Sequence, residues 1–307
     1  MRIVFMGTPD FAVPSLQILL QHGYEIAAVV TAPDKPGGRL GVQASAVKQF
    51  AVQNGLKVLQ PEKLRNPDFL QELRTLKADL QVVVAFRMLP EVVWNMPPLG
   101  TLNLHGSLLP KFRGAAPINW AIIRGEKTTG VTTFLLQHEI DTGDILLQQP
   151  IPIGPDETAG ELHDRMMLIG AQLVLETVRR LEQNSIQAQA QPDQEATHAP
   201  KIFRETCEIN FHQTSQTLHN FIRGLSPYPG AWTTLQGKTF KILRSSLPPD
   251  AVTESSKPIG SYTTDGKTFL KVRTENGFLQ LEEVQLEGKK RMTVRELLNG
   301  YTLFQPD

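Results

Sequence analysis

Two polar side chains lie close together in an otherwise apolar stretch, Thr101-Leu102-Asn103-Leu104-His105. Successive side chains of a β-strand point to opposite faces, so Asn103 and His105 would share one face. Unpaired polar groups in a buried strand cost free energy, so this pair requires a reason. Gly106 ends the strand and leaves His105 at its carboxyl edge, where open parallel sheets bind ligands. From the spacing alone, the two residues are either a satisfied structural pair or a catalytic pair.

A second polar stretch, His138 to Asp144, separates two predicted strands. Its Asp and Gly content is typical of a simple turn. A carboxylate in this stretch could also face His105, since both lie at sheet edges in the same predicted domain. An amide can donate to a developing oxyanion, an imidazole can donate or shuttle a proton, and a carboxylate can orient the imidazole. Such a set suits acyl transfer to an amine without a covalent enzyme intermediate.

The first half of the chain alternates short apolar runs with amphipathic segments, which predicts a mostly parallel sheet with helices on both faces. A Pro- and Gly-rich stretch over 33–39 predicts a flexible loop. We expect strands over 2–6, 25–31, 57–59, 80–86, 100–105, 131–137 and 144–153, and helices over 10–21, 45–54, 67–76, 89–96, 117–124 and 158–181.

The character of the sequence changes near residue 185. Residues 185–207 are rich in Gln, Ala and Pro without an apolar period, which is typical of a linker. Short alternating stretches over 241–245, 269–274 and 278–286 then predict a small, mainly β barrel or sandwich. We therefore expect an α/β domain over 1–188, a linker over 189–207 and a mainly β domain over 208–307.

Composition and charge exclude several classes of protein. The 31 basic and 31 acidic residues cancel, so any site for a polyanion must be a local patch. The single cysteine, Cys207, excludes an internal disulfide, and none of the 7 histidines has the spacing of a metal ligand. No apolar run approaches the roughly 18 residues of a membrane span, and Asp10 comes too early for a signal peptide. We expect a soluble, cytoplasmic protein without a metal.

Several motifs carry a specific resemblance. The run Asn103 to Pro117, NLHGSLLPKFRGAAP, together with Ile140 to Asp144, IDTGD, resembles the signature of folate-dependent formyltransferases. The opening FMGTPDFA over 5–12, the loop KPGGR over 35–39 and the APKI stretch over 199–202 are similar to the methionyl-tRNA branch of that family. The resemblance runs over essentially the whole chain.

The resemblance implies a fold, a reaction and a catalytic set. The fold would be a Rossmann-like domain followed by a small barrel that resembles an OB fold. The reaction would transfer the formyl group of 10-formyltetrahydrofolate to the amino group of methionine on initiator tRNA, for initiation of translation. Asn103 and His105 would stabilise the oxyanion, and Asp141 would orient His105 and help to remove the amine proton. We expect a monomer with no membrane partner.

The resemblance also implies two sets of binding residues. The expected folate-binding residues are Phe86, Arg87, Met88, Leu89, Pro90, Ser107, Leu108, Leu109, Pro110, Ile140 and Asp141. The expected tRNA-binding residues are Arg39, Lys201, Lys289 and Lys290. Further cations of the second domain either extend this phosphate-facing strip or are solvated surface charges; they are Lys238, Lys241, Arg244, Lys271, Arg273 and Arg291.

The chain departs from the family pattern in three places. Phe86-Arg87 stands where the family usually has Tyr-Gly, and this Arg either points to solvent or meets the glutamate tail of the folate. Leu40 follows Arg39 where more basic residues are expected, which weakens the charge of that loop. His138 stands where an acidic residue is common.

Three alternatives remain at this point. A glycinamide-ribonucleotide formyltransferase would need only the first domain. A formyltransferase that acts on a nucleotide-linked amino sugar has similar length, but is not expected to carry the Gly7-Thr8-Pro9-Asp10 opening or the loop over 35–39. A non-catalytic dinucleotide-binding module would show a Gly-x-Gly-x-x-Gly turn after the first strand, which this opening lacks.

Overall fold

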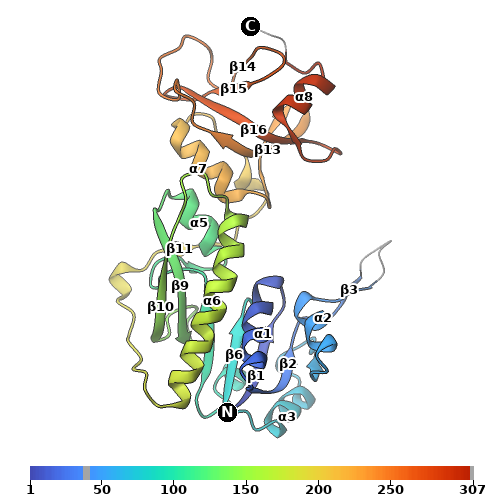
Figure 1. The fold of residues 1–307 in the computed structure, drawn as a ribbon, viewed down its shortest axis with the longest axis vertical. Coiled ribbons are helices and arrows are strands. Elements are labelled where there is room, and N and C mark those ends of the chain that lie inside the picture. Colours follow the sequence, from blue (N-terminus) through green and yellow to red (C-terminus); the bar gives the residue numbers. More distant parts are fainter. Residues whose placement is uncertain (37–41, 305–307) are drawn as a thin grey trace. The chain divides into compact units, whose positions relative to one another are not determined.

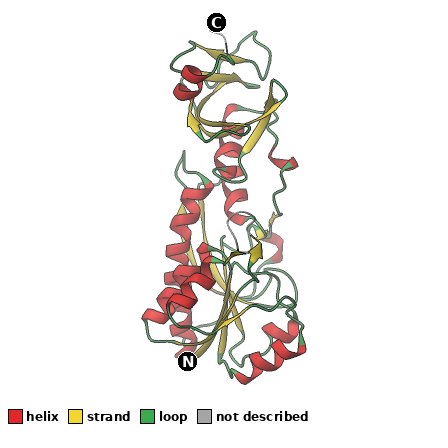
Figure 2. Ribbon diagram, turned by 90° about the vertical axis from the view of Figure 1, so that its right-hand side faces the viewer, coloured by secondary structure: helices red, strands yellow, loops and turns green. Residues whose placement is uncertain are grey.

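The computed structural model describes residues 1–36 and 42–304, and the chain divides into two compact units. The first unit consists of Met1–Gly114, Thr129–Ile151 and His163–His198. The second unit consists of the other described residues. Helices flank the sheet of the first unit on both sides, while strands predominate in the second (Figure 2). The domain limits at 188 and 207 stay a prediction.

A seven-stranded sheet forms the centre of the first unit, in the order β10-β9-β7-β6-β1-β2-β5 (Figure 1). The pairs β1–β2, β1–β6, β2–β5 and β6–β7 are parallel, and β9 is antiparallel to β7. This confirms the predicted α/β fold with a mostly parallel sheet. The strands are β1 (Arg2–Gly7), β2 (Glu25–Val30), β5 (Val58–Leu59), β6 (Leu80–Val84), β7 (Thr101–His105), β9 (Thr128–Leu135) and β10 (Ile145–Pro152).

Helices bury both faces of this sheet. Val4 of β1 packs with apolar residues of α3 and α4 on one face. On the other face α6 lies against β9, where the hydroxyls of Thr133 and Thr177 are hydrogen-bonded at 2.8 Å. The ring of Phe11 contacts His163 of α6, so the short segment before α1 lies on this second face. The helices are α1 (Val13–Gln21), α2 (Ala46–Gln53), α3 (Pro67–Thr75), α4 (Glu91–Trp94) and α6 (Ala159–Glu182).

Two predicted segments differ from the structure for local reasons. The helix predicted over 10–21 is a 3₁₀ helix, Asp10–Ala12, followed by α1, because Pro14 suits only the first turn of an α-helix. The loop predicted over 33–39 enters a short antiparallel pair, β3 (Lys35–Pro36) with β4 (Val42–Gln43). Residues 37–39 of that loop, with Arg39, lie outside the described residues.

The second unit contains a six-stranded antiparallel sheet, in the order β12-β13-β16-β15-β14, with β17 paired to β16. Apolar side chains of the sheet, such as Phe240 of β13 and Leu281 of β16, form a core together with Leu218 of α7 and Leu297 of α8. The predicted mainly β character of this part is confirmed. Its elements are α5 (Pro117–Ile123), α7 (Ser215–Leu225), β12 (Ala231–Leu235), β13 (Lys238–Ser246), β14 (Tyr262–Thr264), β15 (Leu270–Arg273), β16 (Phe278–Leu286), β17 (Met292–Thr293) and α8 (Val294–Gly300). None of the described helices is long and apolar enough to span a membrane.

Candidate active site

Strand β7 places Asn103 and His105 on the same face, as the alternation predicts. In the sheet register Asn103 lies beside Val83 of β6, which faces α3 and α4, while Leu104 faces α6. Leu104 also pairs with Val84, the last residue of β6, so the loops after β6 and β7 leave the sheet at the same edge. The polar pair therefore lies at the carboxyl edge of two adjacent parallel strands.

His105 is held by one main-chain hydrogen bond. Its Nε2 lies 2.9 Å from the carbonyl oxygen of Phe112, and because a carbonyl only accepts, Nε2 carries the proton. Nδ1 then faces Oδ2 of Asp141 at 3.7 Å. That distance is too long for a hydrogen bond, but a carboxylate so close attracts an imidazole that takes a second proton. Nδ1 is therefore the ring nitrogen that faces the Asp141 carboxylate without a hydrogen bond to it.

The Asp141 loop is tightly constrained. The carboxylate accepts a hydrogen bond of 2.8 Å from the Gly114 N–H, and the backbone of Asp141 has a φ of +57°, which is unfavourable for a residue with a Cβ. Gly143 approaches β9 so closely that a Cβ there would lie 1.7 Å from the Leu135 carbonyl oxygen. The turn geometry therefore requires Gly143, whereas Asp141 takes its position at a conformational cost.

Asn103 differs from its two neighbours in the site. Its side chain is half-buried and has no hydrogen-bond partner among the residues that the structure describes. An unoccupied amide on the same face as His105 can donate to a ligand oxygen. The structure thus brings His105 and Asp141 together and leaves the Asn103 amide available beside them.

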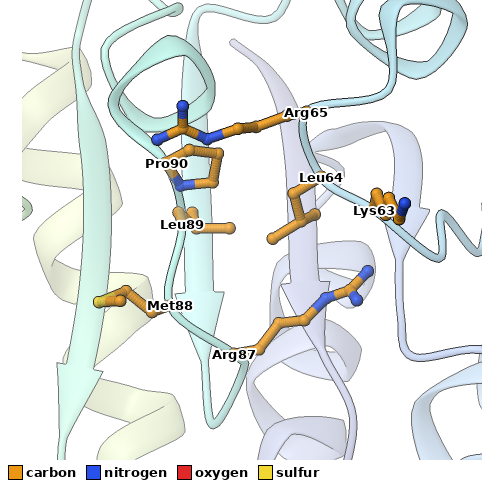
Figure 3. A pocket seen from close by; sticks show the side chains of 7 residues that line it. All are labelled: Lys63, Leu64, Arg65, Arg87, Met88, Leu89 and Pro90. Atoms are coloured by element: carbon orange, nitrogen blue, oxygen red, sulfur yellow. The ribbon is translucent and has the colours of Figure 1, made fainter.

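Four of the predicted folate-binding residues line a cavity of about 390 Å³ after β6 (Figure 3). Met88 is 76% exposed, and Ile140 of the Asp141 loop is 62% exposed, so both present apolar surface to the solvent. Phe86, which is half-buried, does not line the cavity. The lining residues are Lys63, Leu64, Arg65, Arg87, Met88, Leu89 and Pro90.

The sequence prediction did not include Lys63 and Arg65. They precede α3, on a segment whose pattern predicts only a connection. In Figure 3 the guanidinium of Arg65 reaches over Pro90, so this segment forms one wall of the cavity and the loop after β6 forms the other. The two exposed cations make this a cavity suited to an anionic ligand.

Arg87, the residue that departs from the family pattern, joins the two walls. Its guanidinium donates to the carbonyl of Glu62 at 2.8 Å and to the carbonyl of Pro61. Burial lowers the pKa of this guanidinium below its ordinary range. Arg87 therefore fixes the cavity wall through main-chain contacts, which neither of the two sequence hypotheses anticipated.

The other group of predicted folate residues lies in the loop after β7 and is mostly buried. Ser107 donates its hydroxyl to the carbonyl of Lys111 at 2.6 Å, and the Leu109 N–H donates to the Thr132 hydroxyl at 3.1 Å. Pro110 is buried and Leu108 is half-buried. These side chains hold the loop in shape, so a contact with a ligand would come mainly from its main chain.

The predicted tRNA residues of the second unit, Lys201, Lys289 and Lys290, are all exposed. Beside the turn after β16, the pKa of Glu287 is lowered mainly by hydrogen bonds from Thr239 and further by the charges of Lys238 and Arg204. We refer to Arg204, Lys238, Lys289 and Lys290 as the basic cluster.

The other predicted cations of this unit are engaged with protein groups. Arg244 pairs with Glu161, Lys271 pairs with Asp250, and Arg291 pairs with Glu283. Lys241 and Arg273 donate to main-chain carbonyls. These five are therefore poorer phosphate ligands than the exposed lysines of the basic cluster, Lys238, Lys289 and Lys290.

Comparisons with known proteins agree over nearly the whole chain. The family model described as formyl transferase matches residues 1–178, and that of the formyl transferase C-terminal domain matches 201–302. The methionyl-tRNA formyltransferases of Parabacteroides distasonis and Azobacteroides pseudotrichonymphae are 53% and 52% identical, covering 98% and 97% of this chain and 96% and 95% of their own.

Two solved structures share the fold at low identity. The N-formyltransferase from Helicobacter canadensis, in complex with folinic acid and dTDP-3-aminofucose, gives a TM-score of 0.69 at 21% identity, over 94% of this chain and 99% of that one. HypX from Aquifex aeolicus, in complex with tetrahydrofolic acid, gives 0.66 at 18% identity, over 97% of this chain and 47% of that one.

Proposed function

This chain belongs to the formyl transferase family, and we propose that it transfers the formyl group of 10-formyltetrahydrofolate to the amino group of methionine on initiator tRNA. The observation that carries the proposal is the geometry at the end of β7. Nδ1 of His105 faces the Asp141 carboxylate at 3.7 Å, with the Asn103 amide on the same strand face. These groups can assist the attack of an amine on a formyl carbon.

Each of the three residues has one task in this mechanism. The Asn103 amide donates to the formyl oxygen as it becomes negative during attack. His105 takes the proton of the attacking amine at Nδ1, because Nε2 is already bonded to Phe112, and returns it to the nitrogen that leaves. Asp141 stabilises the imidazolium between these two steps. A new bond joins the amine nitrogen to the formyl carbon, and the bond from that carbon to the folate nitrogen breaks.

The donor assignment is supported by the cavity after β6. A reduced folate combines an apolar ring system with anionic carboxylates and supplies the electrophilic formyl carbon. Leu89 and Met88 offer apolar surface, and Lys63 and Arg65 offer positive charge at the opposite wall. The residues fit such a molecule, and the loops after β6 and β7 leave the sheet at a common edge. The folate ligands named for the Helicobacter canadensis and Aquifex aeolicus structures agree with this donor.

The acceptor assignment is supported by the relatives and by the basic cluster. Relatives that match this chain at 53% and 52% identity carry the name methionyl-tRNA formyltransferase. The basic cluster provides exposed cations for a phosphate backbone on a protein of zero net charge. The alternative acceptor is a nucleotide-linked amino sugar, as in the Helicobacter canadensis complex, but that protein is only 21% identical.

A competition between acceptors tests the proposal. Transfer from 10-formyltetrahydrofolate would be measured with charged initiator tRNA, charged elongator Met-tRNA, free methionine and a dTDP-linked amino sugar. We expect initiator tRNA to be formylated with the highest kcat/KM. Equal rates on the three methionine acceptors would contradict the tRNA assignment, and transfer to the sugar alone would establish the alternative.

A further inference from the structure

The segment 189–198 crosses both loops that support the catalytic residues, although its sequence resembles a linker. At one end Gln189 exchanges two main-chain hydrogen bonds of 2.8 Å with Ile145, just after the Asp141 loop. At the other end the Thr197 hydroxyl accepts from the Phe112 N–H at 2.8 Å, and the Thr197 carbonyl accepts from the Arg113 N–H. Phe112 is the residue whose carbonyl holds His105.

Gln191 lies between these two attachments and binds the Asp141 loop directly. Its Nε2 donates to the carbonyl of Asp141 at 2.8 Å and to the carbonyl of Gly143 at 2.7 Å. Its Oε1 accepts from the Nε of Arg113 at 3.0 Å and from an NH2 group of the same guanidinium at 2.9 Å. One planar amide therefore connects the Asp141 loop to Arg113, the residue after Phe112. Phe112 and Asp141 are the residues that face the two ring nitrogens of His105.

The orientation of the Gln191 amide is fixed by its hydrogen-bond partners. Arg113 is only 9% exposed, donates to Gln191 and also pairs with Asp193 at 2.8 Å. A guanidinium has no acceptor, so the Gln191 oxygen must face Arg113 and the NH2 must face the two carbonyls. The amide cannot rotate by half a turn without losing all four bonds.

The Asp141 loop requires such support because its conformation is unfavourable. Asp141 has a φ of +57°, a region that side chains with a Cβ rarely occupy, and such strain persists only where surrounding contacts impose it. The carbonyls that Gln191 holds belong to Asp141 and Gly143, which are the residues on either side of Thr142. Releasing them would let the turn relax and move the carboxylate away from Nδ1 of His105.

We propose that Gln191, oriented by Arg113, is a positioning residue that holds the Asp141 carboxylate against His105. This inference rests on the proposed function, in which Asp141 stabilises the imidazolium. It assigns to Gln191 no contact with substrate and predicts that its effect on turnover passes through Asp141.

The test combines turnover with a direct measure of loop order. Gln191→Met keeps the length of the side chain and removes both the donor and the acceptor, and Gln194→Met is the matched control at an exposed position of the same segment. Formyl transfer would be measured for each in the natural background and with Asp141→Asn. Hydrogen exchange of peptides that cover 140–145 and the melting midpoint would be measured on the same proteins.

We expect Gln191→Met to reduce kcat by about 10- to 100-fold in the natural background, since small displacements of a catalytic group have effects of that order. In the Asp141→Asn background the same change should reduce kcat less than about threefold, because the two changes act on one unit. Exchange over 140–145 should accelerate, while Gln194→Met leaves turnover, exchange and melting as they are.

Equal losses in both backgrounds, or unchanged turnover together with unchanged exchange, would overturn the assignment of Gln191. A variant Asp141→Asn with natural turnover would instead refute the proposed role of Asp141. In that case the exchange measurement alone decides whether Gln191 orders the loop, so the two failures are distinguishable.

Discussion

In the proposed mechanism, the chemistry of His105 is restricted to one of its two nitrogens. Nε2 donates to the Phe112 carbonyl at 2.9 Å, so only Nδ1 is left to exchange protons with a substrate. A substitution that keeps the first bond and removes the second nitrogen therefore separates structure from catalysis. Glutamine has this property, because its terminal NH2 can donate to Phe112 but cannot act as an acid or base near neutral pH.

We predict that His105→Gln and His105→Ala both reduce kcat by about 10²- to 10⁴-fold, the usual contribution of general acid–base catalysis. Their melting midpoints should differ, with the Gln variant closer to the natural protein. His212→Ala, at an exposed position, is the control. Near-natural turnover of His105→Gln would mean that the ring serves only to hold Phe112.

Asn103→Ala should reduce kcat by roughly 10²- to 10³-fold, as expected for a lost oxyanion donor. The fold should not suffer, because the amide has no hydrogen-bond partner among the described residues. Steady-state kinetics and thermal melting of the variant check both statements. A reduced melting midpoint with unchanged kcat would identify Asn103 as a structural residue instead.

The sequence predicted the residues of the site that follow a local pattern and missed those that do not. Alternation along one strand predicted the shared face of Asn103 and His105, and the family motif supplied Asp141. Gln191 bonds to a loop 50 residues away through a side-chain amide, and no local periodicity marks such a contact. Arg65 is recognised as a cavity residue only once α3 is placed beside the loop after β6.

At the scale of elements, apolar runs located the strands well because buried strands need them. The structure has β6 at Leu80–Val84 and β16 at Phe278–Leu286, within or equal to the predicted ranges. The stretch 185–207 was the least predictable, because main-chain and polar contacts fix it at Gln189 and Thr197. Cys207, at its end, is fully buried in the core of the second unit.

Cys207 should have no role in the reaction, because its thiol is buried. Burial raises the pKa of its thiol, which donates to the Phe203 carbonyl at 3.1 Å. A buried neutral thiol is a poor nucleophile, so alkylating reagents should not modify it in the folded protein. We predict that Cys207→Ser keeps full turnover and lowers the melting midpoint by about 2–4 °C, the shift expected for a loss of about 1 kcal/mol. Abolished turnover in a well-folded Cys207→Ser protein would contradict this.

Helix α7 carries a histidine whose burial should make the second unit sensitive to acid. His219 is 1% exposed, and its Nε2 donates to the Pro155 carbonyl at 3.2 Å, while Nδ1 accepts from the Ser245 hydroxyl. Burial lowers its pKa below the ordinary value of 6.5, and the charge of Arg223 lowers it further, whereas the Pro155 carbonyl and Asp156 raise it. The folded state therefore favours the neutral ring.

The unfolded state binds a proton at this position more readily than the folded state, so stability should decline as the pH falls below about 6.5. We predict that the melting midpoint falls between pH 7 and pH 5 and that His219→Gln makes this dependence shallower. His212→Gln is the control in the same unit. Melting curves at several pH values provide the comparison, and parallel pH dependences of the two variants would exclude His219 as the cause.

At the scale of the whole molecule, charge limits how the protein can bind a tRNA. The formal net charge is zero, so no long-range field attracts a polyanion, and binding must depend on local cations. Most cations of the second unit's sheet are engaged with protein groups, while Lys289 and Lys290 are exposed in the turn after β16. Removing the second unit is a poor test of its role, because a chain that ended near Gln189 would also lose Gln191 and Thr197.

Two double substitutions that change the net charge equally are the sharper test. Replacing Lys289 and Lys290 by Ala changes the net charge from 0 to −2, and replacing Lys57 and Lys77 in the first unit changes it equally. Each phosphate contact contributes roughly 0.7–0.9 to the slope of the logarithm of the binding constant against the logarithm of salt concentration. We predict that the first double variant lowers this slope by about 1.4–1.8 for initiator tRNA, if both contacts are lost, while the second leaves it unchanged. An equal change in the two variants would attribute the effect to net charge, and no change in either would show that these lysines make no phosphate contacts.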